Sequence, residues 1–261
     1  MIPKIIHYCW LSGEPFPKSI ENCINTWKRK LPEYEMKCWN TSNFDIHSVS
    51  YVERAYFMKK WAFAADYIRL YALYTEGGIY LDSDVFVKQN FDEFLNFDFF
   101  TSVEYHPKIF EKENGKSLLN SKGELLDSSV CHVPGLGLQA AILGSIKGHP
   151  FLKSCMSFYE NTTFAIPDGK GSGLIAPDFL ANQAVSFGFL YKDEKQLLRD
   201  NMLILPSTIF AGYPSYETDQ TVAVHCCSGS WVETTSMQKV IAKLRRLAVG
   251  VLRLLRIIIQ K

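Results

Sequence analysis

YTEGGIYLDSDV, residues 74–85, joins the end of a helix to a buried strand and then interrupts the strand with two carboxylates. The twin glycines are typical of helix ends, and the apolar run after them is typical of a strand. Residues i and i+2 of a strand share a face, so Asp82 and Asp84 are expected beside Tyr80. Two carboxylates roughly 6–7 Å apart on an extended chain raise each other's pKa or recruit a cation.

A hard divalent cation meets that requirement. Mn²⁺ or Mg²⁺ is often held by few carboxylates, with substrate phosphates completing its coordination shell. A strand end in a parallel sheet is also where the ligand crevice of open α/β folds lies. Asp-x-Asp is a common sequence, however, and two exposed aspartates at a strand end are the alternative at this point.

The run before the glycines, residues 53–75, predicts a helix, because alanines are frequent and neither Gly nor Pro interrupts it. Asp66 and Arg69 are three positions apart and therefore project from one face. The pair is either a helix ion pair or a polar cluster. In the second case Arg69 bonds anionic or hydroxyl oxygens and Asp66 accepts hydrogen bonds from sugar hydroxyls.

Strand-like and helix-like segments alternate along most of the chain, which predicts an α/β sheet. Strands are expected at 4–10, 34–40, 79–87, 98–105, 136–145, 201–207 and 221–227. Helices are expected at 19–32, 53–75, 149–161 and 177–190. Residues 105–135 show no clear pattern.

Charge is distributed unevenly along the 261 residues. The net charge is +1, but seven basic residues and no acidic ones follow Glu233, which leaves residues 1–233 at −6. Residues 236–261 alternate apolar positions at helical spacing and predict a basic amphipathic helix. Three roles stay open for it: docking on the catalytic domain, lying on the inner leaflet of a membrane, or pairing into an oligomer.

The composition also bears on location. The seven cysteines form no CxxC pair, which favours a reducing cytoplasm over a disulfide framework. The N-terminal segment lacks a signal-peptide pattern, and no apolar stretch is long enough to span a membrane. We expect a cytoplasmic protein, either free or peripheral on the cytoplasmic face of the membrane, with no nucleic-acid partner.

The stretch AADYIRLYALYTEGGIYLDSDV, residues 64–85, resembles family 32 of the sugar-nucleotide-dependent glycosyltransferases. This family includes initiating α-1,6-mannosyltransferases and capsular polysaccharide enzymes, and the glucosylating domains of clostridial toxins are more distant relatives. The resemblance extends to IPKIIHYCWLSGEPFP at 2–17 and VAVHCCSGSW at 222–231. It implies a GT-A type, Rossmann-like mixed sheet flanked by helices, with a catalytic domain over 1–233 and a C-terminal amphipathic helix over 234–261.

The resemblance also implies roles for individual residues. Asp84 is the principal metal ligand, Asp82 divides itself between metal, ribose and sugar, and His225 supplies a third ligand. Asp82, Asp84 and Arg69 are the residues expected to serve catalysis. The donor nucleotide sugar is expected to contact Trp10, Asp66, Arg69, Tyr80, Asp82, Ser230 and Trp231. Asp178 and Asn182 are candidates for acceptor or donor contact, or are simply exposed residues near a helix start.

The implied activity is metal-dependent transfer of a hexose, with retention of configuration, from a UDP- or GDP-linked sugar. The implied acceptor is a glycan or lipid-linked glycan in the synthesis of cell-surface polysaccharide. Two other classes stay open: a metal-dependent phosphotransferase, and a catalytically inactive module that binds a sugar nucleotide or glycan.

Overall fold

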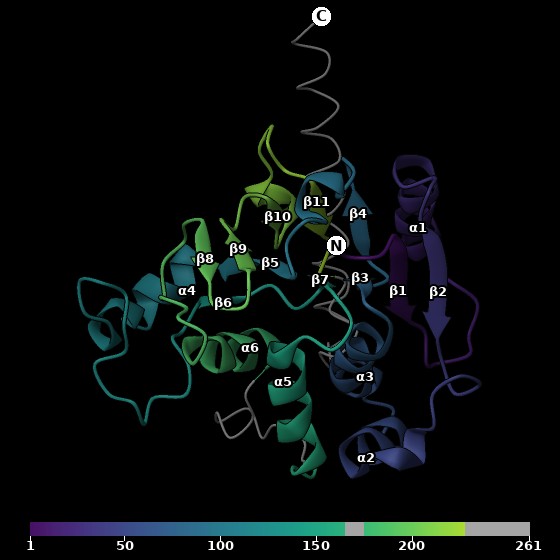
Figure 1. Cartoon of the computed structure of the whole chain (residues 1–261), viewed down its shortest axis with the longest axis horizontal. Coiled ribbons are helices and arrows are strands. Elements are labelled where there is room, and N and C mark those ends of the chain that lie inside the picture. The colour runs from purple at the N-terminus through teal and green to yellow at the C-terminus, as the bar shows by residue number, and fades with distance from the viewer. Residues whose placement is uncertain (165–174, 228–261) are drawn as a thin grey trace, which may run out of the picture. The chain divides into compact units, whose positions relative to one another are not determined.

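Short apolar segments build an eight-stranded mixed sheet in the computed structural model, which describes residues 1–164 and 175–227. Seven strands lie in the order β2-β1-β3-β7-β5-β9-β8, and β6 pairs with β5 (Figure 1). Their bounds are β1 Ile5–Cys9, β2 Glu35–Trp39, β3 Gly78–Leu81, β5 Phe99–Tyr105, β6 Leu136–Leu138, β7 Ile142–Ser145, β8 Gln196–Leu198 and β9 Met202–Leu205.

Strand directions decide which residues meet at one edge of this sheet. β1 is parallel to β2 and β3, whereas β7 is antiparallel to both β3 and β5. β5 and β9 are parallel to each other. The carboxyl ends of β1, β3, β5 and β9 therefore lie at the same edge, where open α/β sheets bind ligands.

A second sheet has three strands, β4 (Val85–Val87), β10 (Phe210–Ala211) and β11 (Ala223–His225). β11 is antiparallel to β4, and their register places His225 opposite Val85. Val85 and His225, which are 140 positions apart in the sequence, thus become neighbours, and Asp84 directly precedes Val85.

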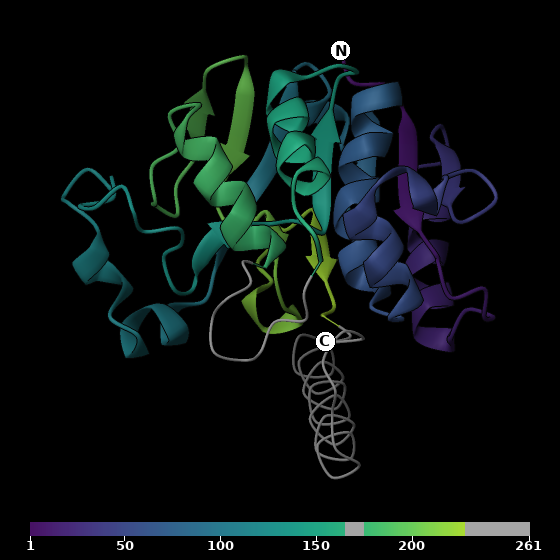
Figure 2. The ribbon, with the colours of Figure 1, turned by 90° about the horizontal axis from the view of Figure 1, so that it is seen from below.

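Helices cover the large sheet on both faces. α2, α3, α5 and α6 lie on one side, and α1 and the small sheet lie on the other (Figures 1 and 2). The helices are α1 Lys18–Lys30, α2 Ser50–Phe57, α3 Trp61–Glu76, α4 Pro107–Lys112, α5 Pro150–Glu160 and α6 Ala176–Val185.

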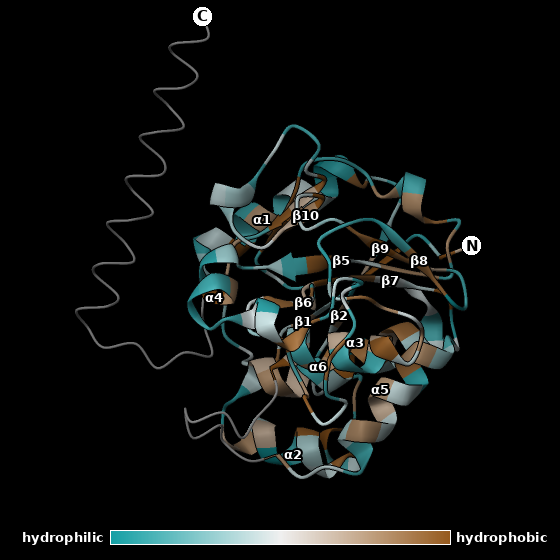
Figure 3. Cartoon of the chain, turned by 90° about the vertical axis from the view of Figure 1, so that its left-hand side faces the viewer, coloured by the Kyte–Doolittle hydropathy of each residue, from teal (hydrophilic) through white to brown (hydrophobic). Residues whose placement is uncertain are grey.

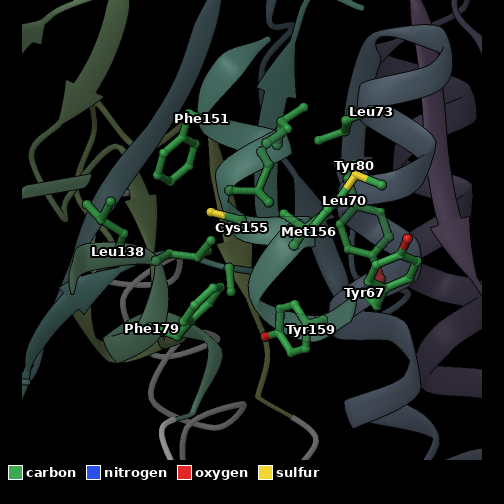
Figure 4. Close-up of a cluster of buried hydrophobic side chains, with 14 of the residues drawn as sticks. Tyr67, Leu70, Leu73, Tyr80, Leu138, Phe151, Cys155, Met156, Tyr159 and Phe179 are labelled. Carbon is green, nitrogen blue, oxygen red and sulfur yellow. The ribbon is translucent and has the colours of Figure 1, made fainter. Parts of the chain in front are cut away.

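The hydrophobic core is split by the sheet into two clusters. Alternate residues of a strand point to opposite faces, so Tyr80 packs under the α3 side while Ile79 and Leu81 pack on the α1 side. Figure 4 shows side chains of α3, α5 and α6 meeting Tyr80 of β3 and Leu138 of β6. Figure 3 shows that the strands in the interior are mainly apolar and that many of the outer loops are polar.

Two predicted elements are wrong in a way that matters for the site. The single helix predicted over 53–75 is two helices, α2 and α3, because Lys59 adopts a left-handed conformation with φ 57°. The single strand predicted over 79–87 is β3 and β4, which belong to different sheets and are separated by a turn at Asp82–Asp84. In that turn the Val85 N–H donates to the Asp82 carbonyl at 2.9 Å.

Other differences are smaller. The strand predicted over 136–145 is β6 and β7 with a break between them, and the helix predicted over 177–190 ends at Val185. β8 and β10 were not expected, and the uninterpreted middle of the chain contains α4. β10 has two residues and β8 has three, too few for an alternating pattern to stand out.

The expected fold class, a mixed α/β sheet flanked by helices, is confirmed. The predicted helix over 234–261 and the predicted boundary at residue 233 lie outside the described residues. Among the described residues, none of the helices has the length and apolar character needed to cross a membrane.

The His7 side chain holds the turn at Gly77 and Gly78 in place. Its Nε2–H donates to the Gly77 carbonyl at 2.8 Å, and its Nδ1 accepts from the Trp39 indole at 3.0 Å. The imidazole is fully buried, and this burial lowers its pKa. The neutral ring therefore ties β1, β2 and the start of β3 together.

Gly78→Ala is expected to lower the free energy of unfolding by about 3 kcal/mol. Gly78 has φ 117°, and an added Cβ would lie 2.7 Å from the Ile5 carbonyl oxygen and 2.9 Å from the His7 imidazole. Gly188→Ala is the matched control, because Gly188 has φ 101° with open space around it, and it should cost about 1–2 kcal/mol. Equal losses in urea denaturation would show that close packing at this turn is unimportant.

Candidate metal and donor site

The two aspartates lie at the carboxyl edge of the large sheet. Asp82 follows β3 directly, and the turn after it brings the Asp84 carboxylate back toward the same space. The side chains are 25% and 14% exposed, so both keep access to a ligand. The predicted juxtaposition of the two carboxylates is thus produced by a turn and not by one continuous strand.

His225 completes a cluster with the two aspartates. Its Nε2 lies 3.3 Å from Asp84 Oδ1 and 3.9 Å from Asp82 Oδ2. One ligand atom from each of the three residues lies within 4.8 Å of the others. Neighbouring ligands of an octahedral ion at about 2.1 Å lie about 3 Å apart. Two carboxylate oxygens and an imidazole nitrogen suit Mn²⁺, so these residues fit the predicted ion.

Arg69 lies behind Asp82 and joins it to Asp66. Its Nη2 is 2.9 Å from Asp66 Oδ1 and 3.4 Å from Asp82 Oδ1, and its side chain is only 6% exposed. Nη1 donates to the Ala140 carbonyl at 2.8 Å, and Nε donates to the Ala65 carbonyl at 3.3 Å. The guanidinium is therefore fixed by the fold, and its charge offsets those of two carboxylates.

Tyr80 holds Asp82 from a second side. Its hydroxyl donates to Asp82 Oδ1 at 2.9 Å, the same oxygen that faces Arg69. The Arg69 guanidinium lies over the Tyr80 ring at 5.0 Å, within the range of a cation–π contact. One oxygen of Asp82 is thus bound by the protein, which leaves Oδ2 directed toward His225.

The protonation of the buried pair follows from its surroundings. Burial raises the pKa of Asp66 to about 7, and the attraction of Arg69 offsets only part of this effect. For Arg69, burial opposes the charge, but Asp82 and Asp66 outweigh it and raise the pKa of the guanidinium. Arg69 thus stays charged, while Asp66 titrates near neutral pH.

His225 is also held by its neighbours. Burial lowers its pKa, but hydrogen bonds with Asp84 and Cys227 outweigh burial and raise the pKa above its usual value. Nδ1 lies 3.4 Å from Cys227 Sγ, and Cys227 Sγ donates to the Gly212 carbonyl at 2.9 Å. The orientation of the ring is therefore set by contacts on both of its nitrogens, with Nε2 facing the carboxylates.

The structure brings together six of the residues that the sequence singled out. These are Asp66, Arg69, Tyr80, Asp82, Asp84 and His225. Trp10 follows β1 at the same edge, where its indole donates to the Glu14 carbonyl at 2.6 Å and its ring packs against Phe16. Ser230 and Trp231 lie outside the described residues.

Asp178 and Asn182 lie on α6. Asp178 is in the first turn, where burial raises its pKa to about 6 and the charges of His132, Glu104 and His106 act on it. Asn182 is one turn further along and is partly buried. Asp178 therefore belongs to a second group of polar residues, with Glu104 and His106 at the end of β5 and with His132.

Sequence reasoning missed several residues that touch this site. Cys9, at the end of β1, is partly buried beside Tyr80 and Arg69, and desolvation raises its thiol pKa to about 12. The Ala140 carbonyl and Cys227 also contact site residues. The position of Cys9 at the end of a predicted strand was the signal that could have identified it. The Ala140 contact is made by a backbone carbonyl, which the sequence cannot indicate.

The fold and the site together define a class of protein. It is an α/β protein with a candidate divalent-cation site at the carboxyl edge of its sheet and a buried Arg–Asp pair behind it. Residues 17–101 match the family model described as "Glycosyltransferase sugar-binding region containing DXD motif". Over this region, about a third of the chain, the sequence is similar to the DXD-containing glycosyltransferases, which confirms the resemblance expected from the sequence.

Two curated proteins that are similar in sequence to this chain are also named as glycosyltransferases. The chain is 33% identical over 119 residues to uncharacterized glycosyltransferase L373 of Acanthamoeba polyphaga mimivirus, covering 42% of this chain and 46% of that protein. It is 25% identical over 162 residues to inositol phosphoceramide mannosyltransferase 3 of Schizosaccharomyces pombe, covering 58% of this chain and 35% of that protein. The matched regions thus span less than half of either relative.

A solved structure is similar at low identity. PaToxG glycosyltransferase superposes with a TM-score of 0.47 and 18% identity, covering 71% of this chain and 69% of that one.

Asp66→Asn is expected to flatten the dependence of stability on pH. The folded-state pKa of Asp66 is raised from 3.8 to about 7, so its contribution is fully present below pH 3.8 and is lost as pH rises through 7. Between pH 5 and 8 the wild type should lose roughly 2 kcal/mol relative to the variant. Urea denaturation at several pH values measures this, and a constant difference between the two proteins would contradict it.

Asp84→Asn is expected to abolish most of the stabilisation by Mn²⁺. An ion at about 100 times its Kd stabilises a folded protein by about 2.7 kcal/mol, and the variant lacks the carboxylate that faces His225. Thermal unfolding with and without Mn²⁺ measures the effect. Asp219→Asn, at an exposed position, is the control and should keep the full shift. A full shift in Asp84→Asn would place the ion elsewhere.

Proposed function

We propose that the chain is a metal-dependent, retaining glycosyltransferase that moves a hexose from a nucleotide diphosphate sugar to a glycan or glycolipid acceptor. One observation carries the proposal. Asp82, Asp84 and His225 converge at the carboxyl edge of the sheet, directly in front of a buried Arg69–Asp66 pair, and four of these residues lie within the matched sugar-binding region.

The metal would be held by Asp84 and His225, with Asp82 reaching it through Oδ2. When bound, a divalent ion supplies Lewis-acid stabilisation of the departing nucleoside diphosphate. Mn²⁺ and Mg²⁺ both fit carboxylate ligands, and the imidazole favours Mn²⁺. The protein's own contribution is to fix the three ligand side chains before the substrate arrives.

Arg69 is proposed as a positioning residue. A guanidinium has five N–H donors, and four of its contacts are made to Ala65, Ala140, Asp66 and Asp82. Little of its hydrogen-bonding capacity remains for a substrate. Its function is then to orient Asp82 and to keep Asp66 beside the donor sugar, which Asp66 is proposed to bind.

The acceptor and the location are proposed from a relative and from the basic C-terminal sequence. The S. pombe relative is named as a mannosyltransferase of inositol phosphoceramide, a lipid. The basic sequence over 236–261 suits attachment to an anionic leaflet. Both favour a lipid-linked acceptor at the cytoplasmic face of a membrane, in the synthesis of cell-surface polysaccharide such as a capsule.

The test is hydrolysis and transfer of a panel of UDP- and GDP-hexoses with Mn²⁺. We expect slow, EDTA-sensitive release of the nucleoside diphosphate, with the anomeric configuration of the product retained in NMR spectra. Asp84→Asn should lower the rate about 10²–10³-fold, whereas Asp219→Asn should not change it.

Other outcomes would contradict the proposal. Release of phosphate from phosphate monoesters, without cleavage of any nucleotide sugar, would identify a phosphotransferase or phosphohydrolase. Mn²⁺-dependent binding of a nucleotide sugar with no turnover would identify an inactive binding module. Turnover unaffected by Asp84→Asn would remove the metal site from the mechanism.

A further inference from the structure

A second polar cluster lies at the carboxyl end of β5, on the same edge as Asp82. Glu104 is the penultimate residue of β5, and His106 follows the strand. Glu104 Oε1 lies 3.0 Å from His106 Nε2, and the two side chains are 16% and 19% exposed. Both are therefore partly covered but remain reachable, and neither was singled out by the sequence.

A short chain of contacts connects this cluster to the metal site. His225 Nδ1 lies 3.4 Å from Cys227 Sγ, and Cys227 Sγ donates to the Gly212 carbonyl at 2.9 Å. A Cβ added to Gly212 would have its nearest atoms at 3.9 Å, and these belong to Gln139, Glu104 and His106. Gly212 thus leaves room for a Cβ in a small gap that three polar side chains border. Cys227 connects Gly212 to His225, the candidate metal ligand.

Gln139 directs an unused donor into this gap. The residue is 1% exposed, and its Oε1 accepts from the Ala141 N–H at 3.1 Å. Its Nε2 has no hydrogen-bond partner among the residues that the structure describes. A buried amide donor without an acceptor is destabilising, so a ligand oxygen placed here would remove that penalty.

Aromatic rings border the cluster. His106 and Tyr213 are in edge contact with centroids 5.5 Å apart, and Tyr213 meets Tyr216 at 5.9 Å and 86°. Tyr213 is 41% exposed and interacts with Cys227 and Glu104. An accessible aromatic ring beside a carboxylate and an amide donor matches the C–H face and the hydroxyls of a pyranose.

The charged groups around the cluster favour some ligands over others. The charged or titratable groups that act on Asp178 are His132, Glu104 and His106, and no Lys or Arg is among them. Glu104 and Asp178 are thus two carboxylates close enough to act on each other, and the cations possible among these four groups are the two histidines. Such surroundings favour a neutral hydroxylated ligand over an anionic one, because bringing like charges together is unfavourable.

We propose that Glu104, His106, Gln139, Gly212 and Tyr213 form the subsite for the acceptor, and that the acceptor residue bound there is a neutral hexose and not an anionic sugar. Glu104 accepts a hydrogen bond from one acceptor hydroxyl, Gln139 Nε2 donates to a second hydroxyl oxygen, and the ring of Tyr213 contacts the apolar face of the sugar. This inference rests on the proposed function and specifies the acceptor class of that same enzyme.

The first test uses Gly212→Val to fill the gap. The φ of Gly212 lies outside the left-handed region, and a Cβ there would make only ordinary van der Waals contacts at 3.9 Å, so the protein should fold. Binding of Mn²⁺ with nucleoside diphosphate, followed by thermal shift, checks that it has. The assay is nucleoside diphosphate release from the donor that is hydrolysed, with and without alkyl glucoside, galactoside and mannoside at tens of millimolar. The wild type should be stimulated severalfold by at least one glycoside, and Gly212→Val should lose this stimulation.

Gln220→Val is the matched control, since it adds the same branched side chain at an exposed position of the same connection between β10 and β11. It should be stimulated as the wild type is. Stimulation retained in Gly212→Val, or the absence of stimulation by every glycoside while donor hydrolysis proceeds, would overturn the inference and leave the proposed function standing. Absence of Mn²⁺-dependent donor hydrolysis would instead refute the proposed function.

The second test uses charge. In the wild type, an alkyl glucuronide should stimulate release about tenfold less than the matching glucoside, since a like charge near Glu104 disfavours it. Glu104→Gln should raise the ratio of glucuronide to glucoside about tenfold. Equal stimulation by both glycosides in the wild type, or an unchanged ratio in the variant, would contradict the assignment of Glu104.

Discussion

The buried Arg69 guanidinium is the interaction on which the rest of the site depends. Three ionisable groups, Asp66, Arg69 and Asp82, occupy an apolar layer between α3 and the sheet, and none would be tolerated there alone. The guanidinium contacts both carboxylates and two backbone carbonyls at once. Asp82 is thereby held at the edge of the core, with Oδ1 bound by Arg69 and Tyr80 and Oδ2 directed toward His225.

The second requirement is the pairing of β11 with β4. Asp84 lies in the turn before β4, and His225 lies at the end of β11, so their contact forms only when the small sheet does. Local sequence cannot create this contact. The candidate metal site is therefore assembled from two separately fixed halves: a local half, held by Arg69 and Tyr80, and a distant half, held by Cys227 and the strand register.

The sequence predicted the contacts between residues close together in the chain and missed most of those between distant segments. Asp66 and Arg69 were predictable because helical spacing puts them on one face, and Tyr80 and Asp82 because strand spacing does. The turn between Asp82 and Asp84 was not, since its residues interrupt an apolar run without a Gly or Pro. Glu104 and Gln139 were missed because the antiparallel pairing of β5 with β6 brings them together, and spacing along the chain does not specify that pairing.

The most direct test of the central claim is the anomalous scattering of Mn²⁺ in crystals grown with the ion and a nucleoside diphosphate. The account predicts one strong peak between Asp82, Asp84 and His225, about 2.2 Å from oxygen and nitrogen ligands of Asp84 and His225. A peak bound only by the nucleotide, or a peak elsewhere on the protein with these three side chains still in mutual contact, would contradict it.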